Sequence, residues 1–159
     1  MKPVILRLTE EKYRELEKLW VAVGLRDFEH FMHKALTLFE WYCIVLSDNH
    51  ALMLCNDTVL MEIKIIFPSP PIVPVTHTYK RFKLTDANGR LQFLQRRSEF
   101  TSLKAVFWGA IYLMEWYAKR VKEGWNLCHY EDASEDAVVE FNTDKIFPAL
   151  IATVAGIKS

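Results

Sequence analysis

The segment Ala35-Leu36-Thr37-Leu38-Phe39-Glu40-Trp41-Tyr42 returns, 75 positions later, as Ala110-Ile111-Tyr112-Leu113-Met114-Glu115-Trp116-Tyr117. The last three residues are identical, and apolar residues precede them at matching positions. Such self-similarity in a fixed order indicates an internal duplication. We therefore expect two related units, residues 1–67 and 77–159, joined by a linker over 68–76 inside one compact domain. Shorter matches flank the repeat in the same order: Leu8-Thr9 with Leu84-Thr85, Leu16 and Leu19 with Leu91 and Leu94, Leu54-Cys55 with Leu127-Cys128, and Ile66-Phe67-Pro68 with Ile146-Phe147-Pro148.

The linker between the two units is rich in proline. Pro68, Pro70, Pro71 and Pro74 are four of the six prolines in the chain. Such a segment favours an extended polyproline conformation and advances about 3.1 Å per residue, so nine residues span roughly 28 Å. That reach lets the second unit begin beside the beginning of the first.

Composition places the chain among soluble, globular proteins. Hydrophobic residues make up 51% of the 159 and charged residues 25%, which is enough apolar material for a core. No run of 18 apolar residues occurs, so no transmembrane helix is expected, and the N-terminal residues lack the pattern of a secretory signal. Three scattered cysteines argue against a disulfide framework and fit a reducing, cytoplasmic location. We expect all of them to be small buried residues: Cys43, Cys55 and Cys128.

The net charge of zero conceals two segments of opposite sign. Residues 80–122 contain ten basic and three acidic residues, a net charge of +7, whereas residues 123–159 contain two basic and seven acidic residues, a net charge of −5. Asymmetry of this kind can produce one basic face, which is the electrostatic signature of polyanion binding. The alternative is that the two segments neutralise each other in space.

The first unit is predicted to be a strand followed by two helices. The side chains from Val4 to Leu8 alternate between two faces, with Val4, Leu6 and Leu8 on one and Pro3, Ile5 and Arg7 on the other, which indicates a short strand. Thr9 then precedes two glutamates, and a threonine N-cap with acids in the first turn starts a helix. Gly24 ends that helix, and Asp27 is a suitable N-cap for the next. Apolar residues spaced three and four apart mark the buried helix faces: Tyr13, Leu16, Trp20 and Val23, then Phe28, Phe31, Ala35, Leu38 and Tyr42.

The second unit follows the same order, with one competing interpretation. Residues 79–84 alternate as a strand, Thr85-Asp86 is suited to open a helix, and Thr101-Ser102 to open the next. Asn88-Gly89, however, is also the strongest short hairpin signal. The competing interpretation pairs residues 79–84 with 90–94 as a β-hairpin. The duplication favours the helix, because the first unit has no turn at this place.

Each unit is predicted to end in an extended appendage. Residues 51–56 and 58–65 form one candidate hairpin around Asn56-Asp57, and residues 125–130 and 137–141 form the other around the acidic loop 131–136. The predicted fold class is therefore α+β, with two tandem strand-helix-helix units around a pseudo-twofold axis, each followed by a β-hairpin. Residues 4–8 should pair antiparallel with residues 79–84.

A strand, a helix, a glycine-containing turn and a second helix within about 45 residues resemble the ribbon-helix-helix family of MetJ, Arc and CopG. The resemblance covers residues 2–46 and 78–122, as a single-chain pseudo-dimer. It is carried by Val4-Ile5-Leu6-Arg7-Leu8-Thr9-Glu10-Glu11, Leu16, Leu19, Gly24-Leu25 and Ala35-Leu36, and in the second copy by Phe82-Lys83-Leu84-Thr85-Asp86, Leu91, Leu94 and Ala110-Ile111.

The resemblance implies a DNA-binding transcriptional regulator. In this family two copies pair their strands into a ribbon that enters the major groove, and the second helices begin near the phosphates. Pro3 and Ile5 also occupy outward positions but have no side-chain hydrogen-bonding groups for base edges, and Asp27 places a negative charge where a phosphate would lie. The DNA-binding positions implied for this chain are Arg7, Tyr79, Arg81 and Lys83 on the ribbon, with Thr101 and Ser102 at the helix start.

Other functional patterns are weak in this sequence. His30 and His33 share a helix face without a third ligand nearby, and Cys43, His50 and Cys55 lack a recognised metal spacing. No glycine-rich phosphate loop occurs, and no pair of carboxylates is marked out as catalytic. We therefore expect no enzyme, no metal and no cofactor. The alternative to DNA binding is a protein-interaction module on the same scaffold, with self-association through exposed hairpin edges as a further possibility.

Overall fold

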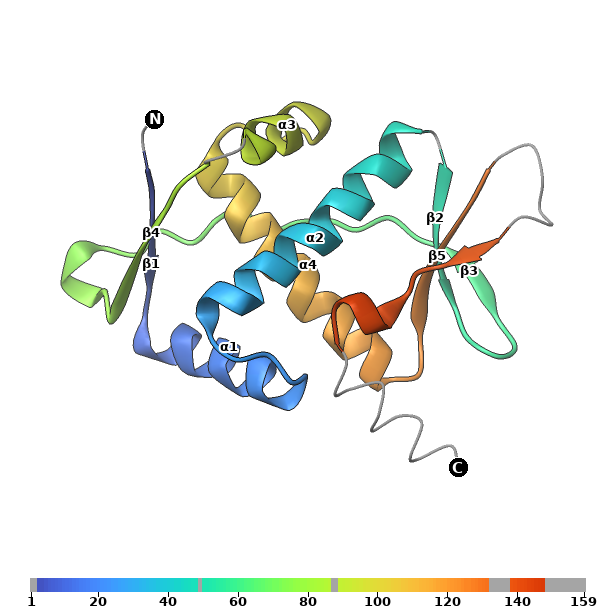
Figure 1. Ribbon diagram of the computed structural model, residues 1–159, viewed down its shortest axis with the longest axis horizontal. Coiled ribbons are helices and arrows are strands. Elements are labelled where there is room, and N and C mark those ends of the chain that lie inside the picture. The colour runs from blue at the N-terminus through green and yellow to red at the C-terminus, as the bar shows by residue number, and fades with distance from the viewer. Residues whose placement is uncertain (1–2, 49, 87–88, 132–137, 148–159) are drawn as a thin grey trace.

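The computed structural model describes residues 3–48, 50–86, 89–131 and 138–147 of the chain. Within these ranges it is a mixed α+β fold with four α-helices and two small antiparallel sheets. Helices α2 (Phe28–Ser47) and α4 (Leu103–Lys122) cross in the middle of the molecule. The two sheets lie at opposite ends of this crossing (Figure 1).

The first sheet is a two-stranded ribbon made of β1 (Val4–Leu8) and β4 (Lys80–Leu84). The strands run antiparallel, with Leu6 opposite Phe82 and Arg7 opposite Arg81. The predicted pairing of residues 4–8 with the strand after the linker is thus confirmed. Leu6 and Leu8 are fully buried, and the Phe82 ring stacks on Phe28 of α2 at 3.8 Å. One face of the ribbon is therefore bound to the helical core.

Helix α1 (Glu10–Ala22) begins where the sequence predicted, because the Thr9 side chain accepts a hydrogen bond from the Lys12 backbone N–H at 3.1 Å. Asp27 and Ser102 cap α2 and α4 in the same way, at 2.9 and 3.1 Å. The positive φ of Gly24, 84°, turns the chain between α1 and α2, a conformation that glycine adopts without strain.

Helix α3 (Arg90–Arg97) decides between the two interpretations of the second unit, since residues 90–94 are helical and the hairpin interpretation is wrong. The helix nevertheless begins later than Thr85-Asp86. Gly89 stands at its start with a φ of 68°. The buried Asp86 side chain accepts hydrogen bonds from the backbone N–H groups of Leu91 and Gln92, at 2.9 and 3.1 Å. Asp86 therefore caps α3 from a position before Gly89, further from the first helical residue than an ordinary N-cap lies.

The second sheet has four strands in the order β3 (Leu60–Glu62), β2 (His50–Cys55), β5 (Asn126–Glu131) and β6 (Val139–Glu140). The two appendages were expected as separate hairpins, but β2 pairs with β5 and joins them. The outer strands β3 and β6 are shorter than the predicted 58–65 and 137–141. Most of the predicted loop 131–136 lies outside the described residues. Two short 3₁₀ turns, η1 (Val75–His77) and η2 (Thr143–Lys145), complete the elements.

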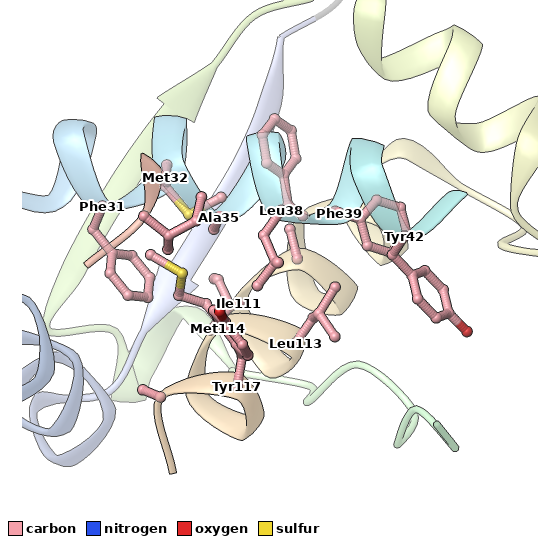
Figure 2. Packing of buried hydrophobic residues seen from close by; sticks show 14 of the residues in the cluster. Phe31, Met32, Ala35, Leu38, Phe39, Tyr42, Ile111, Leu113, Met114 and Tyr117 are labelled. Atoms are coloured by element: carbon pink, nitrogen blue, oxygen red, sulfur yellow. The ribbon is translucent and has the colours of Figure 1, made fainter. Parts of the chain in front are cut away.

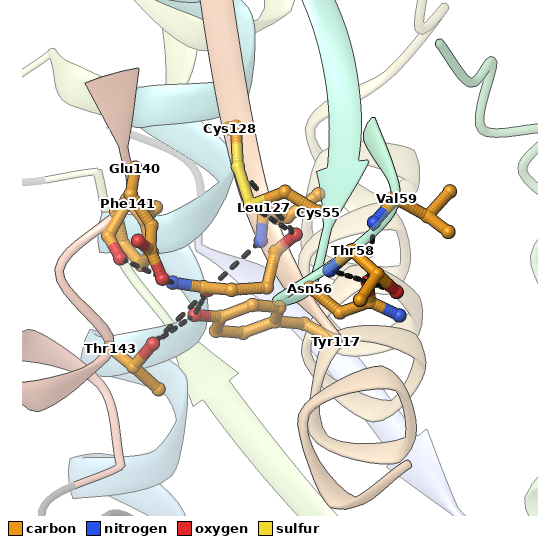
Figure 3. The surroundings of a disulfide bond; sticks show 11 residues. Cys55, Asn56, Thr58, Val59, Tyr117, Leu127, Cys128, Glu140, Phe141 and Thr143 are labelled. Atoms are coloured by element: carbon orange, nitrogen blue, oxygen red, sulfur yellow. Dashed lines mark hydrogen bonds between the residues drawn. A yellow bond between two sulfur atoms is a disulfide. The ribbon is translucent and has the colours of Figure 1, made fainter. Parts of the chain in front are cut away.

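A disulfide joins Cys55 of β2 to Cys128 of β5, across 73 residues of sequence. The expectation of unpaired cysteines is therefore wrong at two positions and confirmed for Cys43, which is a buried free thiol. The bond lies beside a polar network around Asn126 (Figure 3). A structural disulfide is more usual in oxidising compartments, so the cytoplasmic location stays a prediction. None of the described helices is long and apolar enough to cross a membrane.

The core is continuous from the ribbon to the second sheet. Its centre is the α2–α4 crossing, where Ala35 and Leu38 approach Ile111 and Met114 (Figure 2). The two glutamates of the repeat make reciprocal ion pairs at the edge of this crossing. Lys12 of α1 bonds Glu115 of α4 through both carboxylate oxygens, at 2.8 and 2.9 Å, and Arg90 of α3 bonds Glu40 of α2 at 2.8 Å.

Candidate nucleic-acid interface

The exposed face of the ribbon carries three cations. Residues directly opposite each other in an antiparallel pair point to the same side of a sheet, so the register places Ile5 with Lys83 and Arg7 with Arg81 on one face. Arg81 and Lys83 are exposed, and Ile5 and Arg7 are half-buried. The inner face packs on α1, α2 and α4, so these four side chains form the ribbon's outer surface.

Arg7 and Arg81 face each other without an intervening acid. Like charges directly opposite on neighbouring strands destabilise the pair. Arg7, Arg81 and Lys83 form no ion pair with any described residue. The sheet therefore retains an uncompensated positive charge on its outer face, which an external anion would neutralise.

A cavity of about 270 Å³ lies between the ribbon and the start of α4. Arg7 and Lys104 line it together with Trp108 and the linker residues Pro70–Val73. Its described lining contains two cations and no carboxylate. The polyproline linker thus passes beside β1 and accounts for the partial burial of Arg7, while Lys104 stays exposed in the first turn of α4.

Thr101 and Ser102 are exposed at the beginning of α4, as the sequence predicted. The Ser102 hydroxyl caps the helix by accepting from the Ala105 N–H, so it is already engaged in the free chain. The N-terminal ends of α2 and α4 both lie on the ribbon side of the molecule (Figure 1). Lys104 lies beside Thr101 and Ser102 in the first turn of α4, but the sequence-based prediction did not include it, because only those two residues occupy the helix-start positions that the resemblance implies.

Tyr79 is placed differently from the other predicted ribbon residues. It lies just before β4, and its ring contacts Tyr13 of α1 at 5.7 Å between centroids. Its hydroxyl accepts a hydrogen bond from Arg14 at 2.9 Å, and Lys80 lies over its ring. The structure therefore ties Tyr79 to α1 and brings Arg7, Arg81 and Lys83 together without it.

The start of α2 has a different electrostatic character from the start of α4. Asp27 accepts from the His30 N–H, and the His30 Nδ1 accepts from the Arg26 N–H at 3.1 Å. Partial burial, followed by the charges of Arg26 and Lys34, lowers the pKa of His30. This histidine is therefore neutral near pH 7 and does not offset Asp27. The start of α2 is therefore less favourable for an anion than the start of α4.

The described residues contain no group of three or more histidines, cysteines or acids close enough to hold a metal ion. Comparison of the chain with protein-family models, with curated proteins and with solved structures finds no match. Among the described residues, the basic outer face of the ribbon is the feature that points most directly to a binding function.

Proposed function

We propose that this protein binds double-stranded DNA by placing the β1–β4 ribbon in the major groove, as a transcriptional regulator. The observation that carries the proposal is the uncompensated outer face, on which Arg7 stands directly opposite Arg81 beside Lys83. A two-stranded ribbon fits the major groove in width, and arginine and lysine are the side chains that contact guanine edges there.

The proposal includes a pseudo-twofold arrangement of two units, β1-α1-α2 and β4-α3-α4, each followed by its appendage. It is supported by the antiparallel pairing of β1 with β4. The reciprocal ion pairs add to this support, because Glu40 and Glu115 occupy equivalent places in the repeat and each contacts the first helix of the other unit. A ribbon that most family members build from two chains would then be complete in one.

Within this arrangement the second unit contributes most of the DNA contacts. Arg81 and Lys83 would contact base edges. Thr101, Ser102 and Lys104 would lie beside a phosphate, because the free N–H groups of a helix start attract anions. In the first unit Arg7 would contribute to the groove, whereas Ile5 and the capping Asp27 would contribute no contact to an anion. We propose no catalytic role for these residues.

The alternative proposal, a protein-interaction module, is favoured by one specific observation. The linker exposes large apolar side chains: Ile72 is 94% and Val75 72% accessible to solvent. An extended proline-rich segment with exposed apolar residues suits an aromatic-lined groove on a partner. Both proposals use the same scaffold, so DNA binding itself distinguishes them.

Binding of mixed-sequence duplex DNA at several salt concentrations tests the proposal. The logarithm of the binding constant should fall with the logarithm of salt concentration, with a slope of about −0.9 for each phosphate contacted. Arg81→Ala and Lys83→Ala should each weaken binding to the preferred site by about 1–3 kcal/mol, because each removes a side chain that hydrogen-bonds a base edge. The matched control is Lys122→Ala, because Lys122 is an exposed lysine at the opposite end of α4.

Selection of a preferred site from random duplexes would then measure specificity. If Arg81→Ala relaxes the preference at one base pair, the ribbon contacts base edges as proposed. If the purified protein shows no salt-sensitive binding at low ionic strength, the interaction-module proposal replaces it.

A further inference from the structure

A separate and larger cavity lies between α2, the segment after β3 and the turn after α3. Its volume is about 570 Å³, within the range of roughly 300–1,000 Å³ that is typical of small-molecule sites. Tyr42 and Cys43 of α2 line one side, Lys64 and Phe67 another, and Arg97 and Phe100 the third. None of these residues belongs to the ribbon's outer face.

The apolar wall of this cavity is a fixed cluster of aromatic rings. The Phe67 ring meets Tyr42 and Phe100 edge-on, with centroids 5.5 and 5.3 Å apart. Phe100 also stacks on Phe39 at 5.6 Å. Its ring lies so close to α4 that a Cβ at Gly109 would come within 2.6 Å of it. The absence of a side chain at Gly109 therefore leaves room for the Phe100 ring. The aromatic wall is preformed in the free protein.

The polar residues at the cavity give it a net positive charge. Lys64 and Arg97 are exposed, and neither forms an ion pair with a described residue, Glu99 included. Glu99 is the one carboxylate among the described lining residues. The Arg97 side chain lines the cavity, and its guanidinium lies over the Phe93 ring, 4.7 Å from the ring centroid. Two cations and one carboxylate give the described lining a net charge of +1.

The remaining polar groups in the wall are uncharged at physiological pH. Burial raises the pKa of the Tyr42 hydroxyl to about 12 and that of the Cys43 thiol to about 12. The Tyr42 hydroxyl points away from the rest of the core cluster (Figure 2). The wall therefore offers a hydrogen-bonding hydroxyl beside aromatic surface and adds no negative charge that would repel an anion.

We propose that this cavity binds a small aromatic carboxylate, with its ring against Phe67 and Phe100 and its carboxylate beside Lys64 and Arg97. Aromatic rings favour the edge-on and offset contacts that this wall offers. One carboxylate would neutralise the net charge of +1 on the cavity lining. Its hydrogen bonds to Lys64 and Arg97 would be charge-assisted. The proposal does not depend on DNA binding, because the two sites share no residue.

Isothermal titration calorimetry with indole-3-acetate tests the proposal on the full chain without DNA. We expect saturable binding, with affinity at least about tenfold lower for the double variant Lys64→Gln/Arg97→Gln, because it removes both cations that would form charge-assisted hydrogen bonds with the carboxylate. The matched control is Arg96→Gln, which removes an exposed neighbouring arginine that does not line the cavity. The neutral analogue indole-3-acetamide should bind as weakly as the double variant binds the acid.

A second variant keeps the result interpretable if the charge changes disturb folding. Leu46 lines the cavity and is 45% exposed, so Leu46→Trp should obstruct the cavity without removing a buried side chain. It should abolish indole-3-acetate binding and leave the circular dichroism spectrum unchanged. The proposal is overturned by absence of saturable binding in the wild type, by equal binding of the acid and the amide, or by tighter binding of decanoate than of indole-3-acetate.

Discussion

The ribbon and the four-stranded sheet share one kind of strand pairing but are stabilised by different interactions. In each, a strand from the first half of the chain pairs antiparallel with a strand from the second half: β1 with β4, and β2 with β5. The four-stranded sheet adds the Cys55–Cys128 disulfide and a buried polar network. The ribbon adds nothing across its outer face except arginine opposite arginine. The four-stranded sheet is thus cross-linked, whereas the ribbon has like charges opposite each other on its outer face.

The polar network of the four-stranded sheet is centred on Asn126 (Figure 3). Its Oδ1 accepts from the Tyr117 hydroxyl at 2.6 Å and from the Leu127 N–H at 2.9 Å. Its Nδ2 donates to the Glu140 carboxylate and the Phe141 carbonyl, both at 2.8 Å. Tyr117 is fully buried, and burial raises the pKa of its hydroxyl well above the ordinary value. The tyrosine therefore stays protonated, and its hydroxyl bonds both Asn126 and the Thr143 hydroxyl, the latter at 2.7 Å.

Asn126→Ala should produce the largest effect on stability. The substitution removes the half-buried amide that bonds Tyr117, Thr143, Leu127 and Phe141, and a buried polar group that loses its partner costs about 1–3 kcal/mol. We expect a loss of about 2–4 kcal/mol in the free energy of unfolding, measured with urea. Asn56→Ala is the matched control, because Asn56 makes its hydrogen bonds to Thr58 and Val59 in an exposed turn. Equal losses for the two variants would contradict a central role for the buried network.

Breaking the disulfide should have the next largest effect. A cross-link that closes a long loop typically stabilises a protein by about 2–4 kcal/mol. Cys55→Ala/Cys128→Ala, or a reductant added to the wild type, should lower the free energy of unfolding accordingly. Cys43→Ala controls for loss of a thiol outside the bond. Indistinguishable unfolding curves with and without reductant would mean that strand pairing alone holds β2 to β5.

The sequence predicted the ribbon better than the four-stranded sheet, and the reason is physical. Alternation in residues 4–8 and 79–84, together with the repeat, was enough to pair β1 with β4. Hairpin signals such as Asn56-Asp57 act only between neighbouring strands, so they could not show that β2 pairs with β5. The disulfide was missed because an odd number of cysteines without local spacing carries no pairing information. The repeat contained a signal for this pair, because Cys55 and Cys128 occupy matching positions in it.

The late start of α3 shows a similar limit. Thr85-Asp86 has the composition of an N-cap, but the capping distance depends on the positive φ of Gly89, which allows Asp86 to reach the N–H groups of Leu91 and Gln92. In the candidate site, three of the predicted ribbon residues share the outer face, whereas Tyr79 does not. Its position before β4 ends the alternation, and aromatic packing with Tyr13 holds its ring against α1.

On the ribbon, Arg7→Ala should affect binding and stability in different ways. Removing one of two opposed arginines relieves like-charge repulsion, so the free energy of unfolding should stay within about 0.5 kcal/mol of the wild-type value or rise slightly. DNA affinity should fall at the same time, with a smaller salt dependence. Urea unfolding and fluorescence anisotropy measure the two quantities. A variant with reduced stability as well as reduced affinity would indicate that Arg7 is a structural residue rather than one that binds DNA directly.

The smallest effects should come from the reciprocal ion pairs, which attach α1 and α3 to the central crossing between the two sheets. The side chains of Lys12 and Glu115 are 29% and 30% exposed, and those of Arg90 and Glu40 are 30% and 37% exposed, so solvent screens both pairs. Partly exposed pairs contribute about 0–1 kcal/mol.

Double-mutant cycles with Lys12→Met and Glu115→Gln, and with Arg90→Met and Glu40→Gln, should give coupling energies in this range. The Lys12–Glu115 pair should give the larger value, because Lys12 contacts both carboxylate oxygens. Added salt should weaken both couplings, whereas a coupling insensitive to salt would contradict solvent-screened ion pairs as the link between the units.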